Sequence, residues 1–138
     1  MTRKTLSTVA AALLAASIAS SAMVAPAAAG GSFSIGFAPG NEREERTLRT
    51  GLGLYSLYNS VKGGASIRQR GNGNAAGIAQ NGRRNLGIVH QQGDGHTGTL
   101  NQNGNGNAYG LFQYGRNTNA QVEQNGNRRS GATFVYGW

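Results

Sequence analysis

The chain contains no cysteine, only two prolines and only five carboxylates among its 138 residues. Without thiols it has no disulfide and no cysteine-based metal site, so a small fold must be stabilised in another way. Three of the carboxylates fall within residues 42 to 45 and offer no set of catalytic acid, base and nucleophile. We therefore expect no enzyme activity and no cofactor.

Recurring metal ligands are also absent from the sequence. His90 and His96 are its only histidines, and Asp94 is its only aspartate, whereas calcium-binding solenoid repeats need an aspartate in every unit. No Gly-Lys-Ser/Thr follows the glycine strings, which excludes a phosphate-binding loop of that type. We expect the two histidines at surface or ladder positions and not as a ligand pair.

Acidic charge is scarce relative to basic charge. With 13 basic residues the formal net charge is +8. The arginines are scattered and are not interleaved with regularly spaced aromatic residues, as a base-stacking surface would require. The charge is interpreted as a source of solubility and mutual repulsion, with no specific nucleic-acid partner.

Residues 1–29 have the pattern of a secretory signal peptide. Arg3 and Lys4 precede an apolar stretch from Val9 to Val24, which ends in small residues before Gly30. A transmembrane anchor is the alternative, but the stretch is diluted with Ala and Ser and has no stop-transfer flank. We expect a secreted protein that begins near Gly30 and has no membrane span in its mature form.

An 11-residue repeat occupies residues 65–138. Six of the eight glutamines fall in one column: Gln69, Gln80, Gln91, Gln102, Gln113 and Gln124. Two positions earlier is an aliphatic column: Ile67, Ile78, Val89, Leu100, Leu111 and Val122. Two positions after the glutamine is a glycine column: Gly71, Gly82, Gly93, Gly104, Gly115 and Gly126.

Each repeat reads as one short strand and one turn. The glutamine, the aliphatic residue and a mostly small residue four positions before the glutamine share a face, because side chains alternate along a strand. The intervening set is chemically mixed, as expected of a solvent-facing surface: Arg68, Ala79, His90, Asn101, Phe112 and Glu123. An 11-residue period also suits a helical supercoil, but several glycines per unit, each costing about 1 kcal/mol in a helix, disfavour it.

Two such units make a 22-residue coil, so the fold class expected is an all-β solenoid with cross-β stacking. Strands one coil apart would stack at about 4.8 Å, and buried glutamines would pair amide to amide. An asparagine column at the turns, formed by Asn74, Asn85 and Asn107, is expected to pair in the same way and to decay to His96, Thr118 and Arg129.

The repeat resembles that of the curlin family. Residues 69–80 match the curlin pattern Q-x-G-x-x-N-x-A-x-x-x-Q in full, and the following units match it in part. The resemblance implies a subunit of curli, the extracellular amyloid fibres of bacterial biofilms, exported through an outer-membrane secretion pore and polymerising head-to-tail from a nucleator. The basic last unit, with Arg128 and Arg129, leaves open whether the chain is similar to the major or to the nucleating subunit.

Residues 30–64 differ from the repeats. Asn41 and Glu44 suggest a capping box that opens a helix over about residues 41–62, with Leu54, Leu57, Tyr58 and Val61 on one face and Gly63-Gly64 at its end. This segment is interpreted as an export signal, as a cap over the first coil's open edge, or as a linker.

Three functions are compatible with these features. The first is a structural subunit of curli-like fibres, with its own copies, the other curli subunit and the secretion pore as partners. The second is a monomeric secreted solenoid that binds, for example, a polysaccharide. The third, a disordered basic protein, is disfavoured by the strict period. The monomer is disfavoured because Val135 and its neighbours suggest an open seventh strand.

Charged residues flank an uncharged centre. No charged side chain occurs in residues 97–115, which we expect to be the most aggregation-prone segment. The expected gatekeeper charges are Arg68, Arg70, Arg83, Arg84, Asp94, Arg128 and Arg129.

Overall fold

The computed structural model describes residues 31–59 and 64–138, and the predicted signal peptide lies outside them. The helix is α2 (Glu42–Tyr58). The strands are β1 (Ser32–Phe37), β2 (Ala65–Arg70), β3 (Ala75–Asn81), β4 (Leu86–Asp94), β5 (Thr97–Asn103), β6 (Ala108–Arg116), β7 (Asn119–Asn125) and β8 (Ser130–Gly137).

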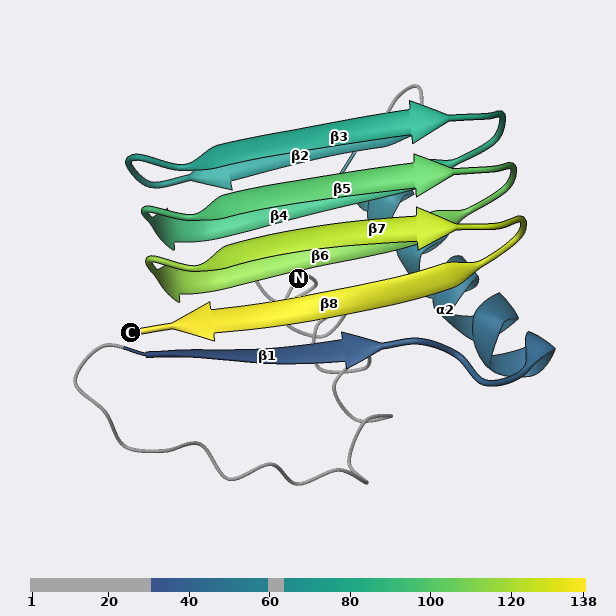
Figure 1. The fold of residues 1–138 in the computed structure, drawn as a ribbon, viewed down its shortest axis with the longest axis horizontal. Coiled ribbons are helices and arrows are strands. Elements are labelled where there is room, and N and C mark those ends of the chain that lie inside the picture. The colour runs from purple at the N-terminus through teal and green to yellow at the C-terminus, as the bar shows by residue number, and fades with distance from the viewer. Residues whose placement is uncertain (1–30, 60–63) are drawn as a thin grey trace.

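Strands β2 to β8 form a β-solenoid, as the 11-residue period predicts. They alternate between two sheets, one in the order β1-β8-β6-β4-β2, here called sheet A, and one in the order β3-β5-β7, called sheet B. Strands one coil apart are parallel and in register, with Gln69 opposite Gln91 and Gln80 opposite Gln102. Figure 1 shows the two stacks face to face, with α2 behind one of them. The predicted 22-residue coil is confirmed.

Helix α2 begins where its cap predicts but ends earlier than expected. The Asn41 side chain accepts a hydrogen bond from the Glu44 N–H at 2.9 Å. The Glu44 carboxylate accepts from the Gly40 N–H at 3.0 Å and not from Asn41, so the capping box is displaced by one residue. The helix ends at Tyr58, capped by Asn59. Val61 and Gly63 lie outside the described residues.

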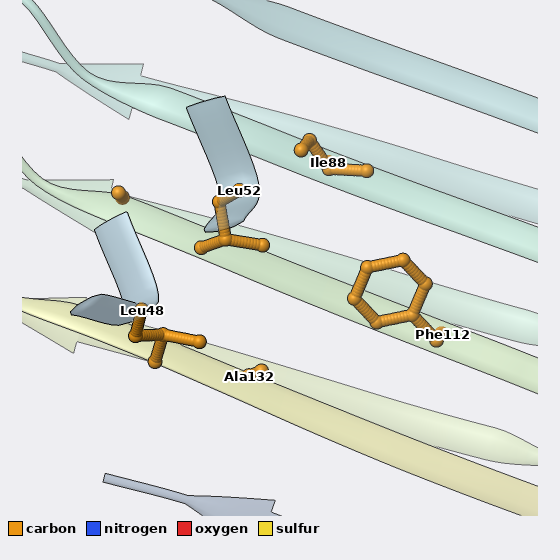
Figure 2. Close-up of a cluster of buried hydrophobic side chains, with 6 residues drawn as sticks. Leu48, Leu52, Ile88, Phe112 and Ala132 are labelled. Atoms are coloured by element: carbon orange, nitrogen blue, oxygen red, sulfur yellow. The ribbon is translucent and has the colours of Figure 1, made fainter. Parts of the chain in front are cut away.

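The face of α2 that packs is not the face predicted. Leu48 and Leu52 are buried against sheet A, in a cluster with Ile88, Ala108, Phe112 and Ala132. Figure 2 shows the two leucines directed at this sheet surface. Leu54 and Leu57, which sequence periodicity placed on the apolar face, are 63% and 77% exposed. Their expected burial is wrong because only the side of α2 facing the sheet finds an apolar partner.

Hydrogen bonds of Arg49 and Ser130 help to fix α2 along the sheet. The Arg49 guanidinium donates to the Gly106 carbonyl and, at 3.5 Å, to the Arg129 carbonyl. From the sheet, the Ser130 hydroxyl donates to the Glu45 carbonyl at 2.9 Å. The helix therefore covers the face of sheet A near β6 and β8, and the interpretation of this element as a cap on the first coil's edge is wrong.

Strand β1 covers the last solenoid strand. It pairs antiparallel with β8, and Ser34 lies opposite Val135. The pairing continues to Gly31 and Trp138, whose backbones exchange both hydrogen bonds, at 3.1 and 3.0 Å. The expectation of an open seventh strand is therefore wrong. The repeat pattern did not reveal β1 because this strand does not belong to the repeat.

The outward faces of the two sheets differ in character. On sheet A, Phe112 is 3% exposed and stacks on Phe134, with ring centroids 4.9 Å apart. On sheet B, Ala79 and Glu123 are exposed. The expected solvent-facing set is thus correct for Arg68, Ala79 and Glu123, and Asn101 is partly buried. It is wrong for His90 and Phe112, because α2 covers them.

Candidate functional site

Glutamine side chains form two ladders in the interior. In sheet A, the Gln69 amide donates to Gln91 and the Gln91 amide to Gln113, both at 2.8 Å. In sheet B, Gln80 donates to Gln102 at 2.8 Å, and Gln102 donates to Gln124 at 2.9 Å. Gln91, Gln102 and Gln113 are fully buried. The predicted inward glutamine column is confirmed in the later coils, where Gln124 is buried too, whereas Gln69 in the first coil is exposed.

The buried ladder glutamines also bond to the opposite sheet. The amide of Gln91 donates to the Ala75 carbonyl at 2.9 Å, and that of Gln102 to the Leu86 carbonyl at 3.1 Å. Gln113 repeats the contact with Thr97 at 2.9 Å. Both amide protons are therefore used, one along the stack and one across the core, which explains how so many amides are buried without leaving an unsatisfied group.

The ladders have a direction. Every amide that bonds to another ladder glutamine donates toward the next coil along the chain, so the first coil presents the acceptor oxygens of Gln69 and Gln80. At the other end, the oxygen of Gln124 accepts from Gln102, and within the described residues its amide nitrogen makes only a 3.5 Å contact to the Ala108 carbonyl. No further glutamine stacks on it within the described residues. In sheet A the ladder ends because Val135 lies opposite Gln113.

The aliphatic column forms the rest of the interior, but not evenly. Val89, Leu100, Leu111 and Val135 are buried together, with Ile78 and Val122 at the margin of the cluster. Ile67 in the first coil is 45% exposed. The interior is therefore complete in the middle coils and open at the N-terminal end of the solenoid.

The side chains of the asparagine column hydrogen-bond to backbone groups and not to one another, so the expected amide-to-amide pairing is wrong. The Asn85 amide donates to the Gly104 carbonyl at 2.9 Å, and its oxygen accepts from the Asn107 N–H at 3.0 Å. Asn107 repeats both contacts with Gly126 and Arg129. Asn74 repeats them with Gly93 and His96. Each asparagine thus clamps the turn of the following coil.

His96 and Thr118 continue the column at one end of the coils. Both are buried, and His96 Nδ1 lies 2.7 Å from the Thr118 hydroxyl. His96 therefore occupies a ladder position, as expected. The third expected replacement, Arg129, is exposed.

The glycine column is required by sterics. Gly104 has φ +114°, and a Cβ added there would lie 1.9 Å from the Gly126 carbonyl oxygen of the next coil. The same approach recurs between Gly82 and Gly104. Any side chain at this position would therefore force adjacent coils apart.

A second turn position adopts positive φ without always being glycine. It contains Gly73, Gly95 and Gly106, but also Arg84 at φ 59°, Asn117 at φ 50° and Arg128 at φ 56°. A non-glycine residue costs about 1–2 kcal/mol in this region. Two of the expected gatekeeper charges, Arg84 and Arg128, thus occupy positions that glycine would fill with less strain.

The other expected gatekeepers lie in different settings. Arg68 and Arg70 are exposed on the edge strand β2, and Arg83 and Arg129 are exposed at turns. Asp94 has a structural contact as well, since its carboxylate accepts from the Asn72 N–H at 2.7 Å. Asn105 and Asn127 make the equivalent contact in other coils.

The edges of the solenoid differ at its two ends. At the N-terminal end, β2 and β3 are the outermost strands of their sheets. At the other end, β7 is the outermost strand of sheet B, whereas β8 is covered by β1 (Figure 1). Three of the four solenoid edges therefore have no strand partner within the described residues.

The outer face of sheet B is polar. Asn81, Asn103 and Asn125 are in register, and the Asn103 amide donates to Asn125 at 2.9 Å. A shallow hollow on this face is lined by Ala79, Gln80, Asn81, Asn101, Asn103 and Glu123. It carries amides and one carboxylate, which is a surface suited to hydrogen bonding rather than to covalent chemistry.

Under α2, one titratable pair is partly buried. Tyr55 Oη lies 2.5 Å from His90 Nδ1. Burial, with smaller contributions from Arg68 and Arg70, lowers the pKa of His90 below 6.5. Burial raises the pKa of Tyr55 to about 12, Tyr114 adds to the rise, and Arg68 opposes it. A neutral phenol and a neutral imidazole therefore share a hydrogen bond, which fastens α2 to sheet A.

In the part of the chain that the structure describes, no group of three or more His, Cys, Asp or Glu residues could hold a metal ion. Among the same residues, no helix is both long enough and apolar enough to cross a membrane. His90 and His96 lie in separate environments, one beneath α2 and one in the turn column.

The sequence holds a partial signal for the packing of α2 on sheet A, which the repeat analysis missed. When alternate repeats are read separately, the outward positions of sheet A hold Ile88, Phe112, Tyr114 and Phe134, while those of sheet B hold asparagines and Glu123. An apolar outward face of this kind indicates a covering element. Nothing comparable marks β1 as the partner of β8.

Comparison of the chain with protein-family models, with curated protein sequences and with solved structures found no match.

Proposed function

We propose that this protein is a structural subunit of an extracellular curli-like amyloid fibre, which grows by head-to-tail stacking of its solenoid. The observation that carries the proposal is the direction of the glutamine ladders. Among the described residues, their first side-chain oxygens accept no hydrogen bond, and the last side-chain amide makes only one long contact. The acceptors of Gln69 and Gln80 lie at one end and the amide of Gln124 at the other. A second copy of the same chain has the complementary groups.

The uneven interior supports the same proposal. Ile67 is 45% exposed in the first coil, whereas Leu100 and Leu111 in the middle coils are fully buried. A solenoid gains most of its stability from contacts between neighbouring repeats, so its terminal coils are weak unless something stacks on them. A preceding subunit would bury the N-terminal coil by pairing with the edges of β2 and β3, which have no strand partner among the described residues.

The proposal includes export and partners carried over from the curlin resemblance. These are a secretion pore in the outer membrane and a second type of curli subunit. The basic turn at Arg128 and Arg129 supports a nucleating role as much as a bulk one. Either role places the protein on the cell surface, in the biofilm matrix.

A monomeric secreted binding module is the second candidate, and two observations favour it. Strand β1 blocks one edge, as a monomer requires. The polar hollow on sheet B, with Asn101 and Asn103, is able to hydrogen-bond a sugar chain.

Thioflavin fluorescence of the purified chain from Gly30, followed by fibre diffraction, distinguishes the two candidates. Growth after a lag, with reflections near 4.7 and 10 Å, is expected of a fibre subunit. A protein that remains monomeric and rich in β-structure would overturn the proposal in favour of the binding module. Seeding growth of a known curli subunit then separates the nucleating role from the bulk role.

A further inference from the structure

The solenoid has an odd number of strands. Of the seven from β2 to β8, four lie in sheet A and three in sheet B. The chain therefore enters the solenoid in sheet A and also leaves it in sheet A. The next position along the solenoid, after β8, belongs to sheet B, on the edge of β7 that is free in the described part of the chain.

This parity restricts how a second copy can stack. The second copy also begins with β2, so a gapless continuation places its β2 on β7 and its β3 on β8. Sheet A of one copy then continues as sheet B of the next. An unrotated second copy could stack in two ways, and both fail. If its β3 paired with β7 of the first copy, its β2 would overlap β8 of the first copy. If its β2 paired with β8 of the first copy, sheet B would lack one strand.

We propose that the free edge of β7, together with the edge of β8 now occupied by β1, binds β2 and β3 of a second copy turned by half a revolution about the solenoid axis. The inference rests on the proposed fibre function and adds to it the orientation of the partner and the strand that must leave.

The side chains match in this rotated register. Extending the repeat places Gln124 opposite Gln69 of the second copy, so the end donor of the ladder meets an unused acceptor. Glu123 falls opposite Arg68, which pairs the carboxylate on the outer face of β7 with a cation. At the turn, the Asn127 N–H meets the Asn72 side chain, which repeats the contact from Asn105 to Asn127.

Strand β1 satisfies the edge of β8 without completing the interior. The hydrogen-bonded pair of Gly31 and Trp138 makes Phe33, Ile35 and Phe37 hydrogen-bonded positions by alternation. These three side chains are partly buried, whereas Ser32, Ser34 and Gly36 on the other face are exposed. The β3 strand of a second copy presents Ala76, Ile78 and Gln80 on its inward face instead. It therefore bonds to the same backbone groups of β8 and adds apolar contacts to the interior, with Gln80 opposite Val135, and it competes with β1 for the same edge.

Pairs of cysteines test the orientation, because the chain contains none of its own. Gln121 and Ser66 lie opposite each other only in the rotated stack, and Gln121 and Gly77 only in the unrotated one. A cysteine at position 77 has room, since an added Cβ meets only Thr99 at 3.9 Å. Adjacent in-register strands are about 4.8 Å apart, within disulfide range.

Mild oxidation of fibres grown from Q121C/S66C is expected to give a covalent series of dimers, trimers and longer chains on non-reducing gels. Fibres of Q121C/G77C are expected to remain monomeric on the same gels. Cross-linking of the second variant alone, or of neither, while fibres form would overturn this inference and leave the fibre function intact. Absence of fibres from the unmodified chain would overturn the fibre function and this inference together.

A second variant tests the departure of β1. Ser34 and Val135 form a non-hydrogen-bonded antiparallel pair, the site at which facing side chains lie closest. In S34C/V135C, oxidation ties β1 to β8, and we expect elongation to be lost until a reductant is added. Equal elongation of the oxidised and reduced forms would show that β1 does not occupy the binding edge.

Discussion

The side-chain amide of Gln102 in β5 donates to the side-chain oxygen of Gln124 in β7 at 2.9 Å, and both residues are buried. The residues are 22 positions apart in sequence and directly opposite in the sheet. This contact links the sequence period, the interior of the fold and the end of the solenoid.

Replacing Gln102 with Leu removes that contact and the contact to the Leu86 carbonyl. It also leaves the Gln80 amide without its ladder acceptor. A buried polar group left without a partner costs about 1–3 kcal/mol, so we expect a clear loss of free energy of unfolding in urea. The exposed Gln92, given the same substitution, is the matched control and should change little. Equal effects at both positions would contradict the inward ladder.

Replacing Arg84 with Gly relieves the strain of a positive φ and removes one expected gatekeeper charge. We expect the free energy of unfolding to rise by about 1 kcal/mol, together with faster fibre growth. Arg83→Ala removes a neighbouring charge without relieving strain, so it should speed growth and leave stability nearly unchanged. If neither variant grows faster than the parent chain, these arginines do not act as gatekeepers.

Truncating Leu52 to Ala opens a cavity between α2 and sheet A, where this side chain is fully buried. Such changes cost about 2–5 kcal/mol. We expect lower thermal stability and faster amide hydrogen exchange throughout α2. Leu57→Ala, at a 77% exposed position, should leave both measurements unchanged. The reverse result would mean that α2 packs through the face that periodicity alone indicated.

Stability should fall in mild acid because of His90. Its pKa is lowered in the folded state, mainly by burial and further by Arg68 and Arg70. As the pH falls below the ordinary value of 6.5, the unfolded chain takes up a proton that the folded chain resists, so unfolding becomes easier. Urea midpoints measured across this range should decline for the parent chain and flatten in His90→Gln. The variant His96→Asn, which keeps His90, should still show the decline.

Much of the fold follows from the repeat. A period of 11 residues with fixed glutamine, aliphatic and glycine columns is sufficient to predict strand length, parallel register and the inward face, since a strand has only two faces and a register error would expose the whole ladder. The positions of Gln91 and Leu100 in the interior could therefore be predicted without coordinates.

Other features depended on contacts that no local pattern encodes. The asparagines bond to backbone because the turns bring carbonyl groups within reach, whereas the sequence shows only a column of similar side chains. The burial of Leu48 and Leu52 in place of Leu54 and Leu57 depended on where the helix lies on sheet A. A hydrophobic period within a glycine-containing helix does not fix that position.

The sequence by itself thus determined the solenoid, because each repeat carries the same alternation and meets an identical neighbour one coil away. Only the tertiary structure decided what happens at the ends and on the outer faces. Pairing of β1 with β8 joins segments about a hundred residues apart, and such contacts depend on which edge is free and which surface is apolar once the repeats have stacked.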